Sequence, residues 1–220
     1  MLLALLVLAQ ASSPPNPVGA AEKLVPPGWT IVSQARGDLN GDRIPDAAIA
    51  IWPSRHAAGA AASYAAGAPP YRLLVGFGLP RGAVRIAADE RRLIEAPGTS
   101  NGSAGRLTPD GITISRGNLE IRRDLLRGHY LYRFRWDAGQ FRLIGYDYTG
   151  SDGHCVTESS IDYLLGRARY ATGPIDESRP VRRKELTLRR GAIPTMKDVA
   201  GEAWYPDAAV VGTPPACELG

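Results

Sequence analysis

Four oxygen-bearing side chains recur at regular intervals in the stretch ARGDLNGDRIPDAAIAIW, near the start of the chain. They are Asp38, Asn40, Asp42 and Asp46, at positions one, three, five and nine of a short loop. Alternate residues of a tight loop point to the same side, and calcium takes several oxygen ligands at once. We therefore predict a calcium site here, with the backbone carbonyl of Ile44, at position seven, as a fifth ligand. Its three carboxylates would repel one another if no cation lay between them.

The segment GDLNGDRIPDAAIAI resembles the calcium loop of FG-GAP and VCBS-type repeats, known from integrin α-chains and exported bacterial proteins. Their pattern is GD-x-[ND]-GDG-x-x-D before a hydrophobic strand, so the resemblance implies the same ligands in a single copy of the loop. Arg43 departs from it, because the family usually has Gly there. A non-Gly residue with positive φ adds strain on the order of 1 kcal/mol. Position twelve is Ile49, which excludes an EF-hand, since that loop ends on a bidentate Glu.

A simpler interpretation of the loop is an Asx-rich turn that binds nothing, because Asp, Asn and Gly favour turns in any case. Four spaced ligands exceed what a turn needs, so we favour the metal site. A loop that surrounds an ion with protein oxygens leaves few positions for a substrate. We therefore expect a structural rather than a catalytic ion.

A second motif, GTSNG at residues 98–102, matches the G-x-S-x-G nucleophile elbow of hydrolases. The elbow works only between a core strand and a helix, which hold its Ser in a strained, exposed turn. Here Pro97 precedes Ser100, and the residues that follow have no helical pattern. We interpret the match as a chance feature of a Gly/Ser-rich loop and predict no catalytic residue there.

The remaining reactive residue types lack the spacing that catalysis or metal binding needs. His154 and Cys155 are adjacent, whereas a catalytic Cys–His pair is normally brought together by the fold. The three His residues have no metal-ligand spacing. Two pairs of carboxylates could act as acid and base, although strands often place carboxylates in this way: Glu158 with Asp162, and Asp147 with Asp152.

An Arg-rich face follows from the clearest alternation in the chain, HYLYRFRW at residues 129–136. Its aromatic side predicts a core face, and its other side, with Arg142 from the next strand, predicts a row of Arg133, Arg135 and Arg142 towards water. The row is either a cationic patch for an acidic partner or anionic envelope polymer, or ordinary protection of strand edges by charge. We favour the second interpretation.

The elements that must position these residues are short strands. Period-two patterns separated by Gly, Pro and Asx turns predict roughly ten of them, with no amphipathic run of helical length. The predicted strands include Trp29–Gln34, Ala47–Trp52, Tyr71–Phe77, Tyr130–Trp136, Gln140–Tyr148 and Cys155–Leu164. We expect a mainly β domain, either an antiparallel β-sandwich or a partly open barrel, with the Asp-rich loop between its first two strands. No repeat supports a propeller.

The ends of the chain differ from its centre in composition. The apolar run MLLALLVLAQA predicts a signal peptide at residues 1–11, and Pro-rich residues 12–27 predict a linker. A single domain then covers residues 28–205, and residues 206–220 form a tail without a clear pattern. The run is too short for a transmembrane helix. Cys155 and Cys217, the two Cys residues of the chain, could pair in an oxidising compartment or remain free.

Composition narrows the function without identifying it. The 220 residues are 44% hydrophobic with a net charge of +4, which allows one sizeable core. The basic residues are scattered, which argues against nucleic-acid binding. We expect a monomeric, non-enzymatic, calcium-stabilised module, periplasmic or secreted, that binds a protein or glycan of the bacterial envelope. The alternatives are a periplasmic inhibitor or immunity-type protein that blocks a secreted enzyme through a protruding loop (residues 56–70 or 97–111), and a hydrolase.

Overall fold

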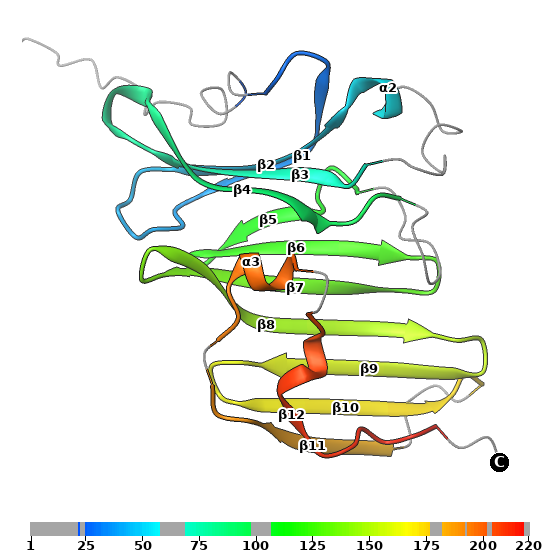
Figure 1. Cartoon of the computed structure of the whole chain (residues 1–220). Helices are drawn as coiled ribbons and strands as arrows, with labels where there is room; N and C mark the ends of the chain where they lie inside the picture. The colour runs from blue at the N-terminus through cyan, green and yellow to red at the C-terminus, as the bar shows by residue number, and fades with distance from the viewer. Residues whose placement is uncertain are drawn as a thin grey trace, which may run out of the picture.

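The computed structural model describes residue 22 and residues 25–57, 69–97, 107–176, 182–191, 193–201 and 204–217. These residues form two antiparallel sheets joined mainly by short turns (Figure 1). The mainly β prediction is therefore confirmed. Neither sheet closes into a barrel within the described ranges. The predicted signal peptide, most of the linker and Ser100 lie outside them.

The first sheet has the strand order β1-β2-β3-β4. Its strands are β1 (Trp29–Gly37), β2 (Asp46–Pro53), β3 (Tyr71–Gly78) and β4 (Val84–Ile94), with the short helix α2 (Ser54–Ala57) after β2 and a 3-10 turn (Pro80–Gly82) before β4. Every residue of β2 is buried. One side of β2 faces the main core, while Ile49 and Ile51 on the other side pack with Leu74, Trp29 and Ile31. Burial on both sides explains why β2 is a continuous apolar run.

The second sheet has eight strands, in the order β12-β11-β10-β9-β8-β7-β6-β5. They are β5 (Ile112–Ser115), β6 (Asn118–Leu125), β7 (Gly128–Asp137), β8 (Gln140–Ser151), β9 (Cys155–Asp162), β10 (Arg167–Pro174), β11 (Arg182–Leu188) and β12 (Val210–Val211). Each strand pairs with the next one along the chain, which is the topology that short turns between consecutive strands favour.

The two sheets approach each other most closely at β1 and β5. Buried Ser33 of β1 donates from Oγ to the carbonyl of Pro109 at 2.8 Å and accepts from the backbone N–H of Ile112 at 3.0 Å. Gly37 lies against Ile114, and a Cβ at Gly37 would lie only 2.5 Å from Cγ2 of Ile114. The hydroxyl of Ser33 and the absence of a side chain at Gly37 therefore allow β1 and β5 to meet without backbone hydrogen bonds between them.

The main core lies between the inner faces of the sheets. It contains the predicted apolar face of β3 and, from the second sheet, inward residues of β5 to β8 that include Leu119, Phe134 and Leu143. Phe134 is fully buried, Tyr130 is 9% exposed, and Tyr132 and Trp136 pack against the core from partly buried positions. The predicted aromatic face of the β7–β8 hairpin is thus confirmed.

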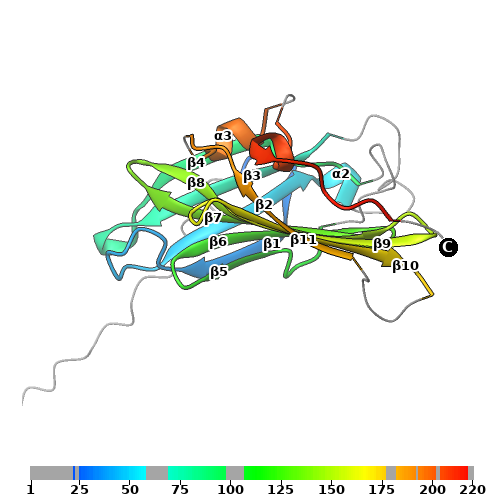
Figure 2. The same ribbon diagram turned by 90° about the horizontal axis from the view of Figure 1, so that it is seen from below.

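The helix α3 (Met196–Val199) fills the space between β4 and β8. Thr195 and Asp198 form a reciprocal capping box at its start, and Met196 and Val199 are buried in the main core. The backbone N–H of Leu143 donates to the carbonyl of Pro194 at 2.8 Å. The helix therefore closes the side of the core away from β1 and β5, and Figure 2 shows it on the same side of the second sheet as the first sheet.

The C-terminal segment is part of the fold. A 3-10 turn (Pro206–Ala209) leads into β12, which pairs with β11. Cys155 and Cys217 are joined by a disulfide, with Cα atoms 6.3 Å apart, so of the two alternatives left by the sequence the paired one is observed. The segment lies over the inner face of the second sheet, where the hydroxyl of Tyr163 donates to the carbonyl of Pro206 at 3.0 Å. The sequence shows no pattern in these residues.

At two places the local sequence pattern predicts the wrong bounds. The sequence pattern predicts separate strands at residues 84–86 and 93–94, but both belong to one strand, β4. Its charged middle hides this continuity, since Asp89 forms a bidentate ion pair with Arg72 of β3, at 2.7 and 2.6 Å. The turn expected at Gly117-Asn118 lies one residue earlier, at Arg116-Gly117. Both residues have positive φ, 52° and 74°, as a tight two-residue hairpin turn requires.

Candidate functional site: the Asp-rich loop

The Asp-rich loop, Asp38 to Asp46, joins β1 to β2 at one end of the first sheet (Figure 1). Asp38 accepts the backbone N–H of Gly41 at Oδ1, at 2.7 Å, and that of Arg43 at Oδ2, at 3.0 Å. Asp42 accepts the N–H of Ile44 at 2.7 Å. The side chains thus hold the turning backbone by Asx-type hydrogen bonds.

The sequence correctly placed the strained position of the loop. Arg43 has φ +66°, the left-handed conformation that the family usually gives to Gly. Asn40 accepts the N–H of Asp42 at 2.9 Å, and its own amide donates to Asp42 Oδ2 at 3.0 Å. Asn40 therefore holds Asp42 through both its backbone and its side chain.

Asp46 differs from the other acidic residues of the loop because its side chain is completely buried. Its Oδ2 accepts the backbone N–H of Leu39 at 2.7 Å, and its Oδ1 accepts that of Gly78, at the end of β3, at 2.9 Å. The loop also packs closely on Gly78, where a Cβ would lie 2.3 Å from the carbonyl oxygen of Pro45. One carboxylate therefore attaches the loop both to itself and to the sheet, a role that sequence spacing did not reveal.

The negative charges of Asp38 and Asp42 act on the buried carboxylate of Asp46. Burial raises the pKa of Asp46, the hydrogen bonds from Leu39 and Gly78 lower it, and the negative charges of Asp42 and Asp38 raise it further. A cation among these groups would relieve both the burial cost and the repulsion. Their electrostatics therefore suit a cation.

The chemistry of the loop fits calcium, although its oxygens are dispersed. Carboxylate and amide oxygens are the hard ligands that calcium prefers, and an oxygen with one N–H partner keeps a further lone pair. In the part of the chain that the structure describes, no three His, Cys, Asp or Glu side chains form a metal-binding group. Binding would therefore require Asp38 and Asp42 to turn towards the ion.

A cavity of about 570 Å³ lies beside the loop. Asp38 and Asn40 line one side, and Arg116, Arg135 and Trp136 of the second sheet line the other. Two guanidinium groups thus share a cavity with the outer residues of an acidic loop. This arrangement balances part of the loop's negative charge.

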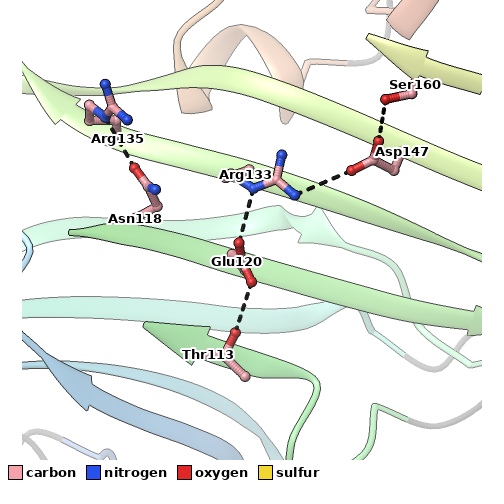
Figure 3. Close-up of polar contacts among 7 residues, drawn as sticks. All are labelled: Thr113, Asn118, Glu120, Arg133, Arg135, Asp147 and Ser160. Carbon is pink, nitrogen blue, oxygen red and sulfur yellow. Dashed lines mark hydrogen bonds and ion pairs between the residues drawn. The ribbon is translucent and has the colours of Figure 1, made fainter. Parts of the chain in front are cut away.

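The predicted Arg row lies on the outer face of the second sheet, where its members contact acidic and amide side chains. Figure 3 shows Arg133 and Arg135 with their partners. Arg133 donates to Glu120 at 2.9 Å and to Asp147 at 3.3 Å. Arg135 donates to Asn118 at 3.1 Å. Glu120 in turn accepts from Thr113 and Asp147 from Ser160, so the network runs across β5 to β9. Arg142 forms an ion pair with Asp137 at 3.0 Å. This pairing supports ordinary surface charge rather than a free cationic patch.

The other candidate acids have local structural roles. Asp152 accepts the N–H groups of Cys155 and His154, both at 2.8 Å, and these bonds lower its pKa. Asp162 accepts the N–H of Leu165 at 2.8 Å in the next turn. Cys155 is disulfide-bonded and cannot act as a thiol nucleophile. These contacts support the interpretation that the acid pairs and the Cys–His neighbours are structural.

Sequence reasoning missed an aromatic groove of about 770 Å³ at the other end of the strands. It opens where β4 ends, beside β7 and the residues after α3. Six of its lining residues are aromatic or charged: Arg92, Glu95, Tyr130, Tyr132, Trp204 and Tyr205. The adjacent pair Trp204-Tyr205, in a segment without a strand pattern, was the available signal.

Comparisons identify no relative of this chain. No model of a known protein family matches it, and no curated protein or solved structure is detectably similar to it. Among the described residues, no helix is both long and apolar enough to cross a membrane.

Proposed function

We propose that the protein is an exported, non-enzymatic β module of the bacterial envelope, stabilised by calcium in its Asp-rich loop. The observation that carries this proposal is the fully buried carboxylate of Asp46, whose pKa is raised by burial and, to a smaller extent, by the negative charges of Asp42 and Asp38 in the same loop. Asp38, Asn40, Asp42, Asp46 and the carbonyl of Ile44 would hold the ion. When bound, calcium would supply positive charge to that loop and take no part in a reaction.

Asp46 explains how binding at the loop would stabilise the whole domain. Its carboxylate contacts Leu39 in the loop and Gly78 in β3. An ion that orders the loop would therefore also strengthen the attachment of β1 and β2 to β3. A ligand that binds only the folded chain stabilises it by mass action.

Export and a binding role have separate support. A disulfide persists in oxidising compartments, and the bond between Cys155 and Cys217 closes a loop across the second sheet. Asp147, Asp152, Asp162 and both Cys residues have structural partners, which favours a binding or structural module over a hydrolase. The loops on which the inhibitor hypothesis depends lie largely outside the described residues, so no observation favours it.

Calcium titration of chelator-treated protein tests the proposal. Isothermal titration calorimetry should show one ion per chain, with a dissociation constant on the order of 0.1–1 mM. At about ten times that constant, calcium should stabilise the fold by about 1.4 kcal/mol. For a domain of this size, the melting temperature should rise by about 3–6 °C.

Three variants make the titration specific. Asp42→Ala should abolish the heat of binding and the shift in melting temperature, whereas Asp110→Ala, an exposed acid in a different turn, should preserve both. Arg43→Gly should tighten binding, because Gly adopts positive φ without strain and the change removes a nearby positive charge. If wild-type protein melts at the same temperature with and without 10 mM calcium (about ten times the weakest constant expected), the loop is only a turn.

A further inference from the structure

The aromatic groove combines apolar ring faces with polar groups. Tyr132 contacts Tyr130 at a ring-centroid distance of 5.0 Å and Trp204 at 5.9 Å, the latter edge-to-face. Tyr205 is 67% exposed, although a large aromatic side chain is usually more buried. Arg92 and Glu95 add charge from the end of β4. A groove of this composition suits a ligand with both apolar faces and polar edges.

A buried positive charge lies directly behind this groove. Arg123 of β6 is 1% exposed, and among the described residues its Nε and Nη1 have no hydrogen-bond partner. Its charge and a hydrogen bond from its side chain act on the hydroxyl of Tyr130 and lower the pKa of that group, against the larger effect of burial. The remaining nitrogen of Arg123 donates to the backbone carbonyl of Glu95 at 3.1 Å, and its guanidinium lies 5.4 Å from the ring centre of Tyr71. Arg123 also pairs in register with Tyr130. It therefore stands behind two residues that line the groove.

The charges in and behind the groove favour an acidic occupant. Arg92 at the rim has a carboxylate nearby, since its charge lowers the pKa of Glu90, whereas Arg123 forms no ion pair among the described residues. A buried charge without a paired counter-ion is costly, and its field is weakly screened at short range. An anionic group in the groove would gain from that field and would lower the cost of burying Arg123.

We propose that the groove binds an acidic saccharide, with pyranose rings on the aromatic faces and a carboxylate near the Arg123 end. The C–H face of a pyranose is apolar and packs against the electron-rich face of an aromatic ring, while its hydroxyls can reach charged groups. A peptide strand added to β4 is less suitable, because α3 packs beside that strand. This inference rests on the binding role proposed above and names the class of ligand.

Titration with two trisaccharides tests the proposal. Trigalacturonate is the acidic probe and maltotriose the neutral one, and Trp fluorescence together with calorimetry reports binding to the full chain. Trigalacturonate should bind saturably and at least about fivefold more tightly than maltotriose. Tyr205→Ala should weaken binding by about tenfold, as expected for an aromatic anchor. Leu165→Ala, also at a residue that is 67% exposed but outside the groove, should not.

Arg123→Met separates charge from stacking. Replacing a buried charge by an apolar side chain of similar length is often neutral for stability, so the variant should fold, and its circular dichroism would show this. It should lose the preference for the acidic trisaccharide and keep the weaker binding of the neutral one. The proposal is overturned if neither sugar binds, if Leu165→Ala weakens binding as much as Tyr205→Ala, or if an acidic pentapeptide binds more tightly than the sugar.

The outcome is independent of the calcium test. Pairing of Tyr71 with Ile94 and of Gly78 with Val84 places the groove and the Asp-rich loop at opposite ends of β3. Asp42→Ala should therefore leave saccharide affinity unchanged under conditions where the variant is folded. Loss of the calcium effect with retained sugar binding would refute only the calcium-stabilised module, and the reverse would refute only the saccharide groove.

Discussion

Replacing Asp46 by Ala should show how strongly one carboxylate attaches the Asp-rich loop to the sheet. The change leaves the buried N–H groups of Leu39 and Gly78 without an acceptor. Each buried donor without a partner costs about 1–3 kcal/mol, which gives about 2–6 kcal/mol for the two. The variant also loses a buried charge and its repulsion by Asp38 and Asp42, which offsets part of this cost. We expect a net loss of about 3 kcal/mol.

Urea unfolding at pH 7 in the presence of chelator measures this loss without any contribution from calcium. In thermal unfolding under the same conditions, the melting temperature should fall by about 6–12 °C, because 1 kcal/mol corresponds to about 2–4 °C in a domain of this size. Asp46→Asn keeps one acceptor oxygen and should lose about half as much, while Asp110→Ala should change stability by less than about 0.5 kcal/mol. A loss below about 1 kcal/mol for Asp46→Ala would refute the attachment role, since one unsatisfied donor alone costs about that much.

Two further predictions concern the second sheet. Cys217→Ser frees a segment tied to a Cys 62 residues away in sequence, so we expect a loss of about 2–4 kcal/mol in urea unfolding. Reduction of the wild-type protein should produce the same loss, and equal stability of reduced and oxidised protein would contradict the prediction. Burial, followed by the charge of Glu95, raises the pKa of Tyr130 to about 12, so the folded chain holds this proton where the unfolded chain releases it. Stability should therefore fall as pH rises from about 10 to about 12. Absorbance at 295 nm should show this Tyr ionising late or only on unfolding, and in Tyr130→Phe the fall should be smaller; an unchanged slope would contradict the assignment.

The strands that the sequence predicted best are those in which the burial of side chains follows a regular pattern along the strand. The β7 pattern alternates strictly, and its aromatic side is the core side. After Asp46, β2 is apolar throughout, and both of its sides are buried. Prediction failed where local chemistry obscured the pattern, as in β4, where Asp89 meets Arg72 across the strands in place of an apolar contact. It failed also for α3, since four residues are too few to show a helical period.

The Asp-rich loop shows how far spacing alone can define a site. Spacing identified the acidic residues, and the family resemblance implied the backbone conformation found at Arg43. Spacing treated all the acids as equivalent, because an Asp at position nine resembles an Asp at position one in the sequence. Only the fold brings the N–H of Gly78, 32 residues away, to the carboxylate of Asp46. The difference between a ligand and an attachment point is therefore a property of tertiary contacts.

The aromatic groove lies beyond sequence reasoning for a related reason. Its walls come from the end of β4, the start of β7 and the residues after α3, which no local pattern connects. The strands that carry Arg123 and Tyr130 could be predicted, but the sequence places the Arg122-Arg123 pair on a solvated face. Arg123 is instead buried at 1% exposure, as an exception to the apolar side of its strand. In the structure that exception stands directly behind Tyr130 and Glu95. At such a position, binding of an anion can offset the free-energy cost of burying the charge. Arg123→Met is therefore the variant that most directly tests whether the groove binds an anion.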